Sequence, residues 1–175
     1  MPRIKDEANV LADAPVTQAR PAGHDGYPVP AEHDSRAISA GAAEETARDL
    51  AAKFIVLLET GTAPDGLFTP DVFCDFTMPQ WRLQAQGIDD VVGMRRHGHP
   101  EPGRVPRSRF DATATGFVLE VEEQWESGGE SWYCRELFRA DVSDHGISQL
   151  SVYCTGDWDS ELVARHAKAV RLLRS

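Results

Sequence analysis

Alternating apolar and polar residues fill most of the second half of this 175-residue chain. Four such segments follow one another, and short turns rich in glycine, serine and aspartate separate them. The segments comprise residues 110–115, 117–125, 132–140 and 147–154. A period of two is typical of strands that bury one face, and turns this short join antiparallel neighbours. We therefore expect this half of the chain to form one sheet.

Helical periodicity precedes the strands. Over residues 44–59, apolar side chains recur at the i, i+3, i+4, i+7 spacing of an amphipathic helix, and Gly61 predicts its end. Its stripe consists of Ala47, Leu50, Ala51, Phe54, Leu57 and Leu58. A second helix is expected after Gly87, and a third, capped by Asp159 or Ser160, closes the chain. The stripe of this third helix, Leu162, His166, Ala169, Val170 and Leu173, predicts that His166 is a core residue.

The remaining segments carry weaker signals. Residues 69–71, Thr-Pro-Asp, have the capping threonine and first-turn proline of a helical turn. Residues 73–78 alternate like a short strand, and residues 98–107 read as a proline- and arginine-rich loop. Helices and strands segregated in this way predict an α+β fold. We expect a curved antiparallel sheet that wraps around the long first helix and leaves a cone.

Residues 1–43 differ in composition from the rest. They hold five of the eleven prolines and a single aromatic residue, Tyr27. Without a sustained apolar period, such a segment cannot bury enough surface to offset the entropy lost on ordering. We expect a disordered or loosely docked N-terminal extension over residues 1–43 and one domain over residues 44–175.

Charge and hydropathy limit the expected partners and location. Eighteen basic and 28 acidic residues give a net charge of −10 at pH 7. Such a surface repels phosphate backbones and anionic lipid, so neither nucleic acid nor a membrane is expected as a partner. No apolar run approaches the ~20 residues of a membrane span, and no signal peptide is recognisable, so we expect a cytoplasmic protein. Cys74, Cys134 and Cys154 are odd in number and far apart, which favours buried free thiols over disulfides or a zinc site.

Three stretches resemble the SnoaL-like proteins of the nuclear transport factor two superfamily. They are Leu67-Phe-Thr-Pro-Asp-Val-Phe73, Asp75-Phe-Thr-Met-Pro-Gln-Trp81 with Gly87-Ile-Asp-Asp-Val-Val92, and Gly146-Ile-Ser-Gln-Leu-Ser-Val-Tyr-Cys-Thr-Gly156. That superfamily also holds ketosteroid isomerase, scytalone dehydratase and limonene epoxide hydrolase. The resemblance implies a cystatin-like α+β barrel around a small-molecule cavity. None of the stretches is a catalytic signature, and this fold hosts unrelated activities as well as non-catalytic binding.

Glu136 is the first candidate for chemistry. It lies in the middle of a strand face that otherwise carries Trp132, Cys134, Phe138 and Ala140. If that face is the concave one, burial should raise the pKa of this carboxyl toward neutrality, as a general acid or base requires. The alternative is that Glu136 pairs with an arginine of a neighbouring element.

Further candidates lie nearer the predicted mouth of the cone. Asp75 would be the second carboxyl, and two carboxyls in one apolar cavity would split their pKa values into an acid and a base. A carboxylate near this first strand abstracts a proton in ketosteroid isomerase-like members, which the resemblance extends loosely to Asp75. Tyr153 and His97 would polarise or orient a substrate. Trp81, Trp132, Phe138 and Phe54 would form the walls that bind it.

Metals and cofactors are not expected. His97-Gly-His99 has two possible ligands, but no third ligand is signalled and arginines flank the segment. The sequence has no phosphate-binding glycine loop, dinucleotide fingerprint or nucleophile elbow.

The sequence therefore favours a cofactor-free acid/base enzyme for a small, largely apolar substrate. A cyclase, isomerase, dehydratase or epoxide hydrolase, such as those of secondary metabolism, would fit. The alternative is a non-catalytic binding or assembly module. A homodimer is also expected, in which outward glutamates of one subunit meet Arg135 and Arg139 of the other.

Overall fold

The computed structural model describes residues 40–173, so the predicted extension of residues 1–43 lies almost wholly outside the described part. The division of the chain at residue 43 stays a prediction. The elements are α1 (Ala40–Thr60), β1 (Phe68–Met78), β2 (Trp81–Gln86), α2 (Ile88–Gly98), β3 (Gly103–Ala112), β4 (Gly116–Ser127), β5 (Glu130–Ser143), β6 (Gly146–Cys154), β7 (Trp158–Asp159) and α3 (Ser160–Ala169).

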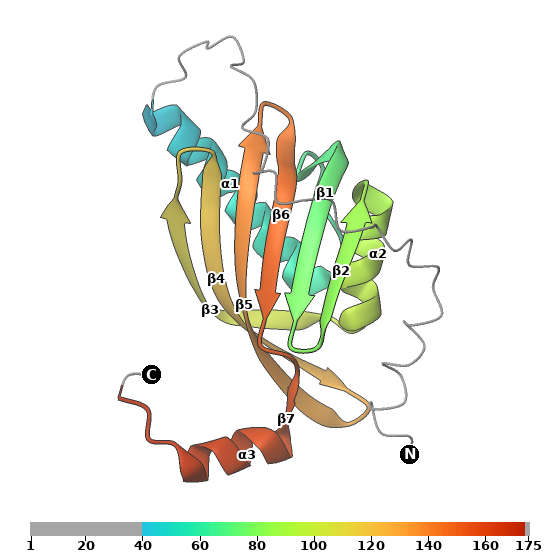
Figure 1. Ribbon diagram of the computed structural model, residues 1–175, viewed down its shortest axis with the longest axis vertical. Coiled ribbons are helices and arrows are strands. Elements are labelled where there is room, and N and C mark those ends of the chain that lie inside the picture. The colour runs from blue at the N-terminus through green and yellow to red at the C-terminus, as the bar shows by residue number, and fades with distance from the viewer. Residues whose placement is uncertain (1–39, 174–175) are drawn as a thin grey trace, which may run out of the picture. The chain divides into compact units, whose positions relative to one another are not determined.

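One curved sheet organises the described residues (Figure 1). Its strand order is β2-β1-β6-β5-β4-β3, and the short β7 pairs with β5. The predicted α+β fold, with a curved sheet around the first helix, is confirmed. Two details of the prediction were wrong, because the sheet is mixed and does not close into a barrel. The parallel pair joins β1 to β6, which brings the first strand of the chain beside the last long one.

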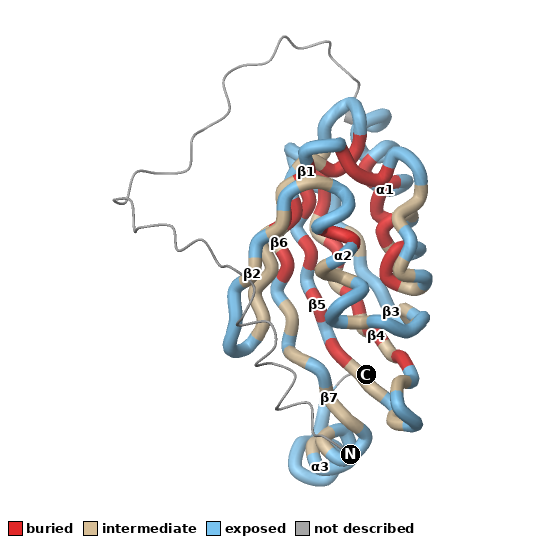
Figure 2. The backbone as a smooth tube through the Cα atoms, turned by 90° about the vertical axis from the view of Figure 1, so that its right-hand side faces the viewer, coloured by how far each residue is buried: buried red, intermediate tan, exposed pale blue. Residues whose placement is uncertain are grey.

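Helices α1 and α2 lie on the same side of the sheet (Figure 2). All six residues of the predicted α1 stripe are buried, and α1 packs mainly against β3 and β4. Helix α2 packs against β1 and β2 through its buried residues Val91 and Val92. Burying a large apolar side chain contributes about 1.5–3 kcal/mol, so these two stripes stabilise the helices more than their intrinsic propensity does.

Helix α1 is longer than predicted at its start and ends where predicted. It begins at Ala40, and Glu44 pairs with Arg48 on its exposed side at 2.8 Å. At its end Gly61 takes a positive φ of 67°, and its N–H donates to the carbonyl of Leu57 at 2.8 Å. This conformation is accessible to glycine at low cost, which explains the position of the stop.

Two strand segments that contain prolines were predicted as a helical turn and a loop. Residues 69–71, predicted as a helical turn, belong to β1, and residues 103–107, predicted as loop, belong to β3. Pro70 and Pro106 each lie where the strand register shifts, at the positions where a sheet tolerates a residue without an N–H. Strand β2 was not predicted at all, and it completes a hairpin with β1.

Helix α3 begins as predicted but does not pack as predicted. The Asp159 carboxylate accepts a hydrogen bond from the Leu162 N–H at 2.7 Å, which caps the helix. No residue of α3 is buried, so the prediction that His166 is a core residue was wrong. Its ring instead lies 5.2 Å from that of Trp158, beyond the end of the sheet where β7 pairs with β5. Within residues 40–173, no helix has the length and hydropathy of a membrane span.

Candidate functional site

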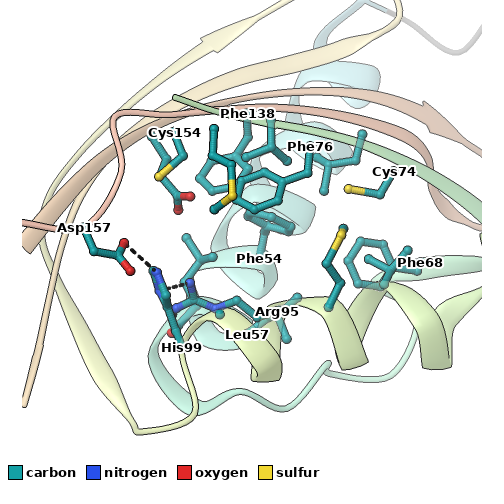
Figure 3. Close-up of a pocket in the computed structure, with 18 residues that line it drawn as sticks. Phe54, Leu57, Phe68, Cys74, Phe76, Arg95, His99, Phe138, Cys154 and Asp157 are labelled. Atoms are coloured by element: carbon teal, nitrogen blue, oxygen red, sulfur yellow. Dashed lines mark hydrogen bonds and ion pairs between the residues drawn. The ribbon is translucent and has the colours of Figure 1, made fainter. Parts of the chain in front are cut away.

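A cavity lies between the two inner helices and the concave face of the sheet (Figure 3). The empty space in it is about 640 Å³ when open solvent at its mouth is included, and the centre of a water-sized sphere can occupy about 80 Å³ of that space. Its lining is largely apolar: Phe54, Leu57, Leu58, Phe68, Cys74, Phe76, Met78, Val91, Met94, Phe138, Leu150 and Val152. The remaining lining residues are Arg95, Gly98, His99, Glu136, Cys154 and Asp157, and most of them gather at one end.

Aromatic rings form the apolar part of this cavity. Phe54 of α1 and Phe138 of β5 meet edge to face, with ring centroids 4.7 Å apart. Phe68 of β1 packs on the other side of Phe54, at 6.2 Å. Phe54 and Phe138 thus lie where the sequence analysis placed them, on the cavity wall, although their role in binding is untested.

Strand register brings the polar groups together. Glu123 of β4 pairs with Cys134 of β5, and Glu136, two residues further along β5, pairs with Cys154 of β6. Because residues two apart share a face of a sheet, all four side chains project toward the concave side. The two carboxyls are therefore diagonal neighbours across β4 and β5, on the buried face.

Glu136 is a buried carboxylic acid. Only 5% of the residue is exposed, and its Oε2 atom has no hydrogen-bond partner among the described residues. Burial first, and then the neighbouring Glu123 carboxylate, raise the pKa of Glu136 well above its ordinary value of 4.5. Glu136 therefore keeps its proton to a higher pH than a free glutamate does, and it is one of the residues that line the cavity.

Glu123 next to it has the opposite character. Burial alone would raise its pKa, but hydrogen bonds from His99 and Glu136 and the charge of Arg95 hold the pKa of Glu123 far below its usual range. The Arg95 guanidinium donates to the Glu123 carboxylate at 2.6 Å and to the Leu58 carbonyl at 2.7 Å. The arginine that the sequence analysis considered as a partner for Glu136 thus pairs with its neighbour.

His99 connects the Glu136–Glu123 pair to Asp157, which is partly exposed to solvent. Its Nδ1 lies 3.5 Å from Glu123 and its Nε2 lies 3.4 Å from Asp157, whose side chain is 35% exposed. Burial lowers the pKa of His99, but hydrogen bonds to Asp157 and Glu123 outweigh that effect and raise it overall. The ring stacks on Trp125 at 4.1 Å and also contacts Arg95 (Figure 3), so its orientation is fixed from several sides.

Two predicted catalytic residues lie outside the cavity lining. Asp75 and Tyr153 project from the outer face, because their neighbours Cys74 and Cys154 occupy the inner one. The expectation that they face the cavity was wrong. Asp75 accepts a hydrogen bond from Arg82 Nε at 2.9 Å, and this interaction lowers the pKa of Asp75, which makes it a poor base. Tyr153 is 58% exposed.

Three further predicted residues are also absent from the lining. His97 is exposed near the end of α2, and Trp81 is 47% exposed at the start of β2. Trp132 stacks on Trp125 at 6.4 Å, so it supports His99 from behind and does not form a wall. Arg135 pairs with Glu120 inside the same chain, and the predicted homodimer stays untested.

Sequence reasoning missed Glu123, Arg95 and Asp157, and it chose His97 where the structure places His99. A signal for Glu123 was present, since it continues the alternation of Leu119 and Val121 and is therefore an inward carboxyl. No comparable signal marked Arg95 or Asp157, because only the fold brings their segments to β4.

The polar end of the cavity also contains side chains that can ligate metals. Among the described residues, His99, Cys134 and Asp157 form one group of potential ligands, and Cys134, Glu136 and Cys154 form another. A hydrogen bond from the Cys134 thiol, partly opposed by burial, lowers the pKa of Cys154 from 9.0 to about 7. The three cysteines are free, as predicted.

No protein-family model and no curated protein matches this sequence. Solved structures do match. An NTF2-like protein from Anabaena variabilis has a TM-score of 0.56 at 17% identity, over 66% of this chain and 90% of that one. The epoxide hydrolase/cyclase-like enzyme SalBIII, which acts in pyran ring formation in the polyether salinomycin, has a TM-score of 0.54 at 9% identity, over 66% and 98%. A ketosteroid isomerase-like protein from Catenulispora acidiphila, in complex with trimethylamine, has a TM-score of 0.51 at 11% identity, over 61% and 85%.

The curved sheet, the inner helices and the cavity between them define an α+β protein with an internal apolar pocket. Its fold is similar to that of the NTF2-like proteins named above, which is the fold that the resemblance of three sequence stretches implied. Identities this low establish the fold and leave the activity open.

Proposed function

We propose that this chain is a cofactor-free acid/base enzyme that acts on a small, largely apolar molecule carrying one reactive oxygen. The observation that carries the proposal is Glu136, a buried carboxyl of raised pKa on the wall of an apolar cavity, with one oxygen unpartnered among the described residues. A general acid must hold a proton and deliver it to the substrate, and in this proposal Glu136 does so by turning the proton that it shares with Glu123 toward the cavity.

The neighbouring groups explain how such an acid could act repeatedly. After Glu136 gives its proton to a substrate oxygen, two carboxylates would lie side by side in a buried site, which favours rapid reprotonation. Glu123, His99 and Asp157 form a chain from Glu136 to the half-exposed surface. In this proposal a proton enters at Asp157, crosses the imidazole from Nε2 to Nδ1 and reaches Glu136 through Glu123.

The cavity limits the substrate class. Rings of Phe54, Phe138 and Phe76 leave room for a compact apolar body, and the polar groups lie at one end of it. An epoxide, a ketone or an alcohol leaving group placed at that end would accept the Glu136 proton. Ring opening, cyclisation, isomerisation and dehydration all begin with that step. The structural similarity to SalBIII is in keeping with this class.

The test is a screen of apolar epoxides, hydroxy-epoxides, enones and tertiary alcohols, with product detection by mass spectrometry. For any substrate found, Glu136→Gln should lower kcat by about 10²–10⁴-fold while leaving binding largely intact, because glutamine keeps the shape and cannot give up a proton. Glu120→Gln, an outward carboxylate on the neighbouring strand, is the matched control.

A Glu136→Gln variant that turns over at the rate of the wild type would refute the acid role. If compounds bind in the cavity but none is converted, the non-catalytic binding module becomes the better description.

A further inference from the structure

Two cysteines that are distant in the sequence meet at the polar end of the cavity. Cys154 pairs with Glu136 in the β5–β6 register, and Cys134 lies two residues before Glu136 on the same strand face. The two thiol sulfurs and a carboxylate oxygen of Glu136 all lie within 4.8 Å of one another. Three side chains that can ligate a metal therefore converge on one point.

An unpartnered atom points to a missing ligand at this place. Glu136 is buried, and its Oε2 has no hydrogen-bond partner among the described residues. A buried polar atom without a partner costs about 1–3 kcal/mol, so such atoms usually face a substrate, a water or an ion. The Gly156 N–H donates to Cys154 Sγ at 3.3 Å, an interaction that favours the thiolate form of a ligand.

The three donor atoms lie close enough together for one zinc-type ion to contact all of them after small movements. Zinc holds sulfur at about 2.3 Å and carboxylate oxygen at about 2.0–2.2 Å, which places neighbouring donor atoms roughly 3.5–3.8 Å apart. Donors within 4.8 Å of one another reach that spacing by side-chain movements of about 1 Å or less. His99 and Asp157 form a second group with Cys134 at the same spacing, separate from the one that contains Glu136 and Cys154.

We propose that Cys134, Cys154 and Glu136 bind a thiophilic divalent cation of the Zn²⁺ type. Two thiolates select such an ion over Mg²⁺ or Ca²⁺, which prefer oxygen ligands. The cation itself would offset the charge of its ionised ligands, because Arg95 and His99 already pair with the neighbouring Glu123.

Binding has a consequence that rests on the proposed function. A cation ligated by Glu136 holds that residue as a carboxylate, so the same residue cannot serve as the proton donor. Metal and acid catalysis then exclude each other, and the ion would act as an inhibitor of the site.

Metal binding can be tested without any substrate. The full-length chain, kept reduced, is titrated with Co²⁺, whose charge-transfer absorption in the near ultraviolet reports thiolate ligation. We expect one thiolate-ligated Co²⁺ per chain, displaced by equimolar Zn²⁺ and unaffected by a large excess of Mg²⁺. The six histidines elsewhere and at the site give no thiolate band, so their binding does not interfere.

Matched variants identify the ligands. Cys154→Ser and Glu136→Gln should each weaken Co²⁺ binding at least tenfold, and circular dichroism verifies that they fold. Cys154 is only partly buried, so its serine variant is the safer of the two cysteine substitutions. Cys74→Ser is the control, because Cys74 is also a buried cysteine of the cavity wall but belongs to neither ligand group.

A titration with no thiolate band, or a Cys154→Ser variant that binds Co²⁺ like the wild type, would overturn the proposal. A Cys134–Cys154 disulfide in chains purified without reductant, together with no Co²⁺ binding after reduction, would also overturn it and identify a redox pair. Failure of the acid role of Glu136 leaves these measurements unchanged, so the two proposals can be judged separately.

Discussion

Glu136→Gln should stabilise the protein, and increasingly so as the pH rises. The folded state raises the pKa of Glu136 above its ordinary value of 4.5, mainly through burial. Below pH 4.5 the carboxyl is protonated in the folded and unfolded states alike. Above that pH the unfolded chain ionises while the folded one does not, so unfolding releases a proton and the free energy of unfolding falls. Glutamine cannot ionise, and it keeps an N–H that can donate to Glu123.

The size of this stability difference follows from the single proton that Glu136 releases on unfolding. The free energy of unfolding of the wild type should fall relative to the variant by about 1.4 kcal/mol for each pH unit above 4.5. The difference levels off once the pH passes the folded-state pKa of Glu136. Two pH units correspond to about 2.7 kcal/mol, which is a large part of the 5–15 kcal/mol that holds a typical domain folded.

Urea unfolding followed by tryptophan fluorescence, at intervals from pH 5 to pH 8, measures this difference directly. Glu120→Gln is the control, because its carboxylate is outward and partly exposed, and its profile should run parallel to that of the wild type. If the difference between Glu136→Gln and wild type is flat over this range, Glu136 is ionised in the folded protein and the acid role is lost with it.

Two further perturbations test the surroundings of the site and the fold. The folded state raises the pKa of His99 above 6.5, so its stabilising contribution is full below pH 6.5 and is lost as the pH rises through the folded-state value. The destabilisation caused by His99→Gln should accordingly be larger at pH 6 than at pH 9 in urea unfolding, and a larger effect at pH 9 would contradict the charge assignment. Gly146→Ala should lower the free energy of unfolding by about 2 kcal/mol or more, because its φ is +128° and a Cβ would lie 2.9 Å from the Leu67 carbonyl. Gly93→Ala is its control, a helical glycine with open space around it, and it should stabilise the protein by about 0.5–1 kcal/mol, with both variants measured by urea unfolding.

The sequence was sufficient for elements whose signal is local. The apolar stripe of α1 and the alternation of β4 to β6 each reflect one buried face, and both appear in the structure. The Asp159 cap was also predicted, because capping needs only the next three residues. Strand β2 carries no such pattern, since its residues are mostly exposed and its pairing with β1 alone makes it a strand.

The site was only partly predictable for the same reason. Glu136 could be identified because a carboxyl on an apolar strand face is a local anomaly. The partners that decide its chemistry come from α2, from β4 and from the segment after β6, and no local pattern relates those segments. Asp75 and Tyr153 were misplaced because alternation shows which residues share a strand face and does not show which of the two faces turns inward.

The polar end of the cavity also lowers the stability of the fold. A core built for stability alone would place apolar residues at positions 123 and 136, which β4 and β5 bury as deeply as their neighbours Val121 and Phe138. Two carboxyls are buried there instead. Arg95 holds Glu123 in its ionised form, and within the described part of the chain one oxygen of Glu136 has no hydrogen-bond partner. Local destabilisation of this kind is common at functional sites, where chemistry outweighs stability. If Glu136→Gln is both more stable and inactive, this one substitution will have measured how much stability the protein loses by keeping a catalytic acid buried.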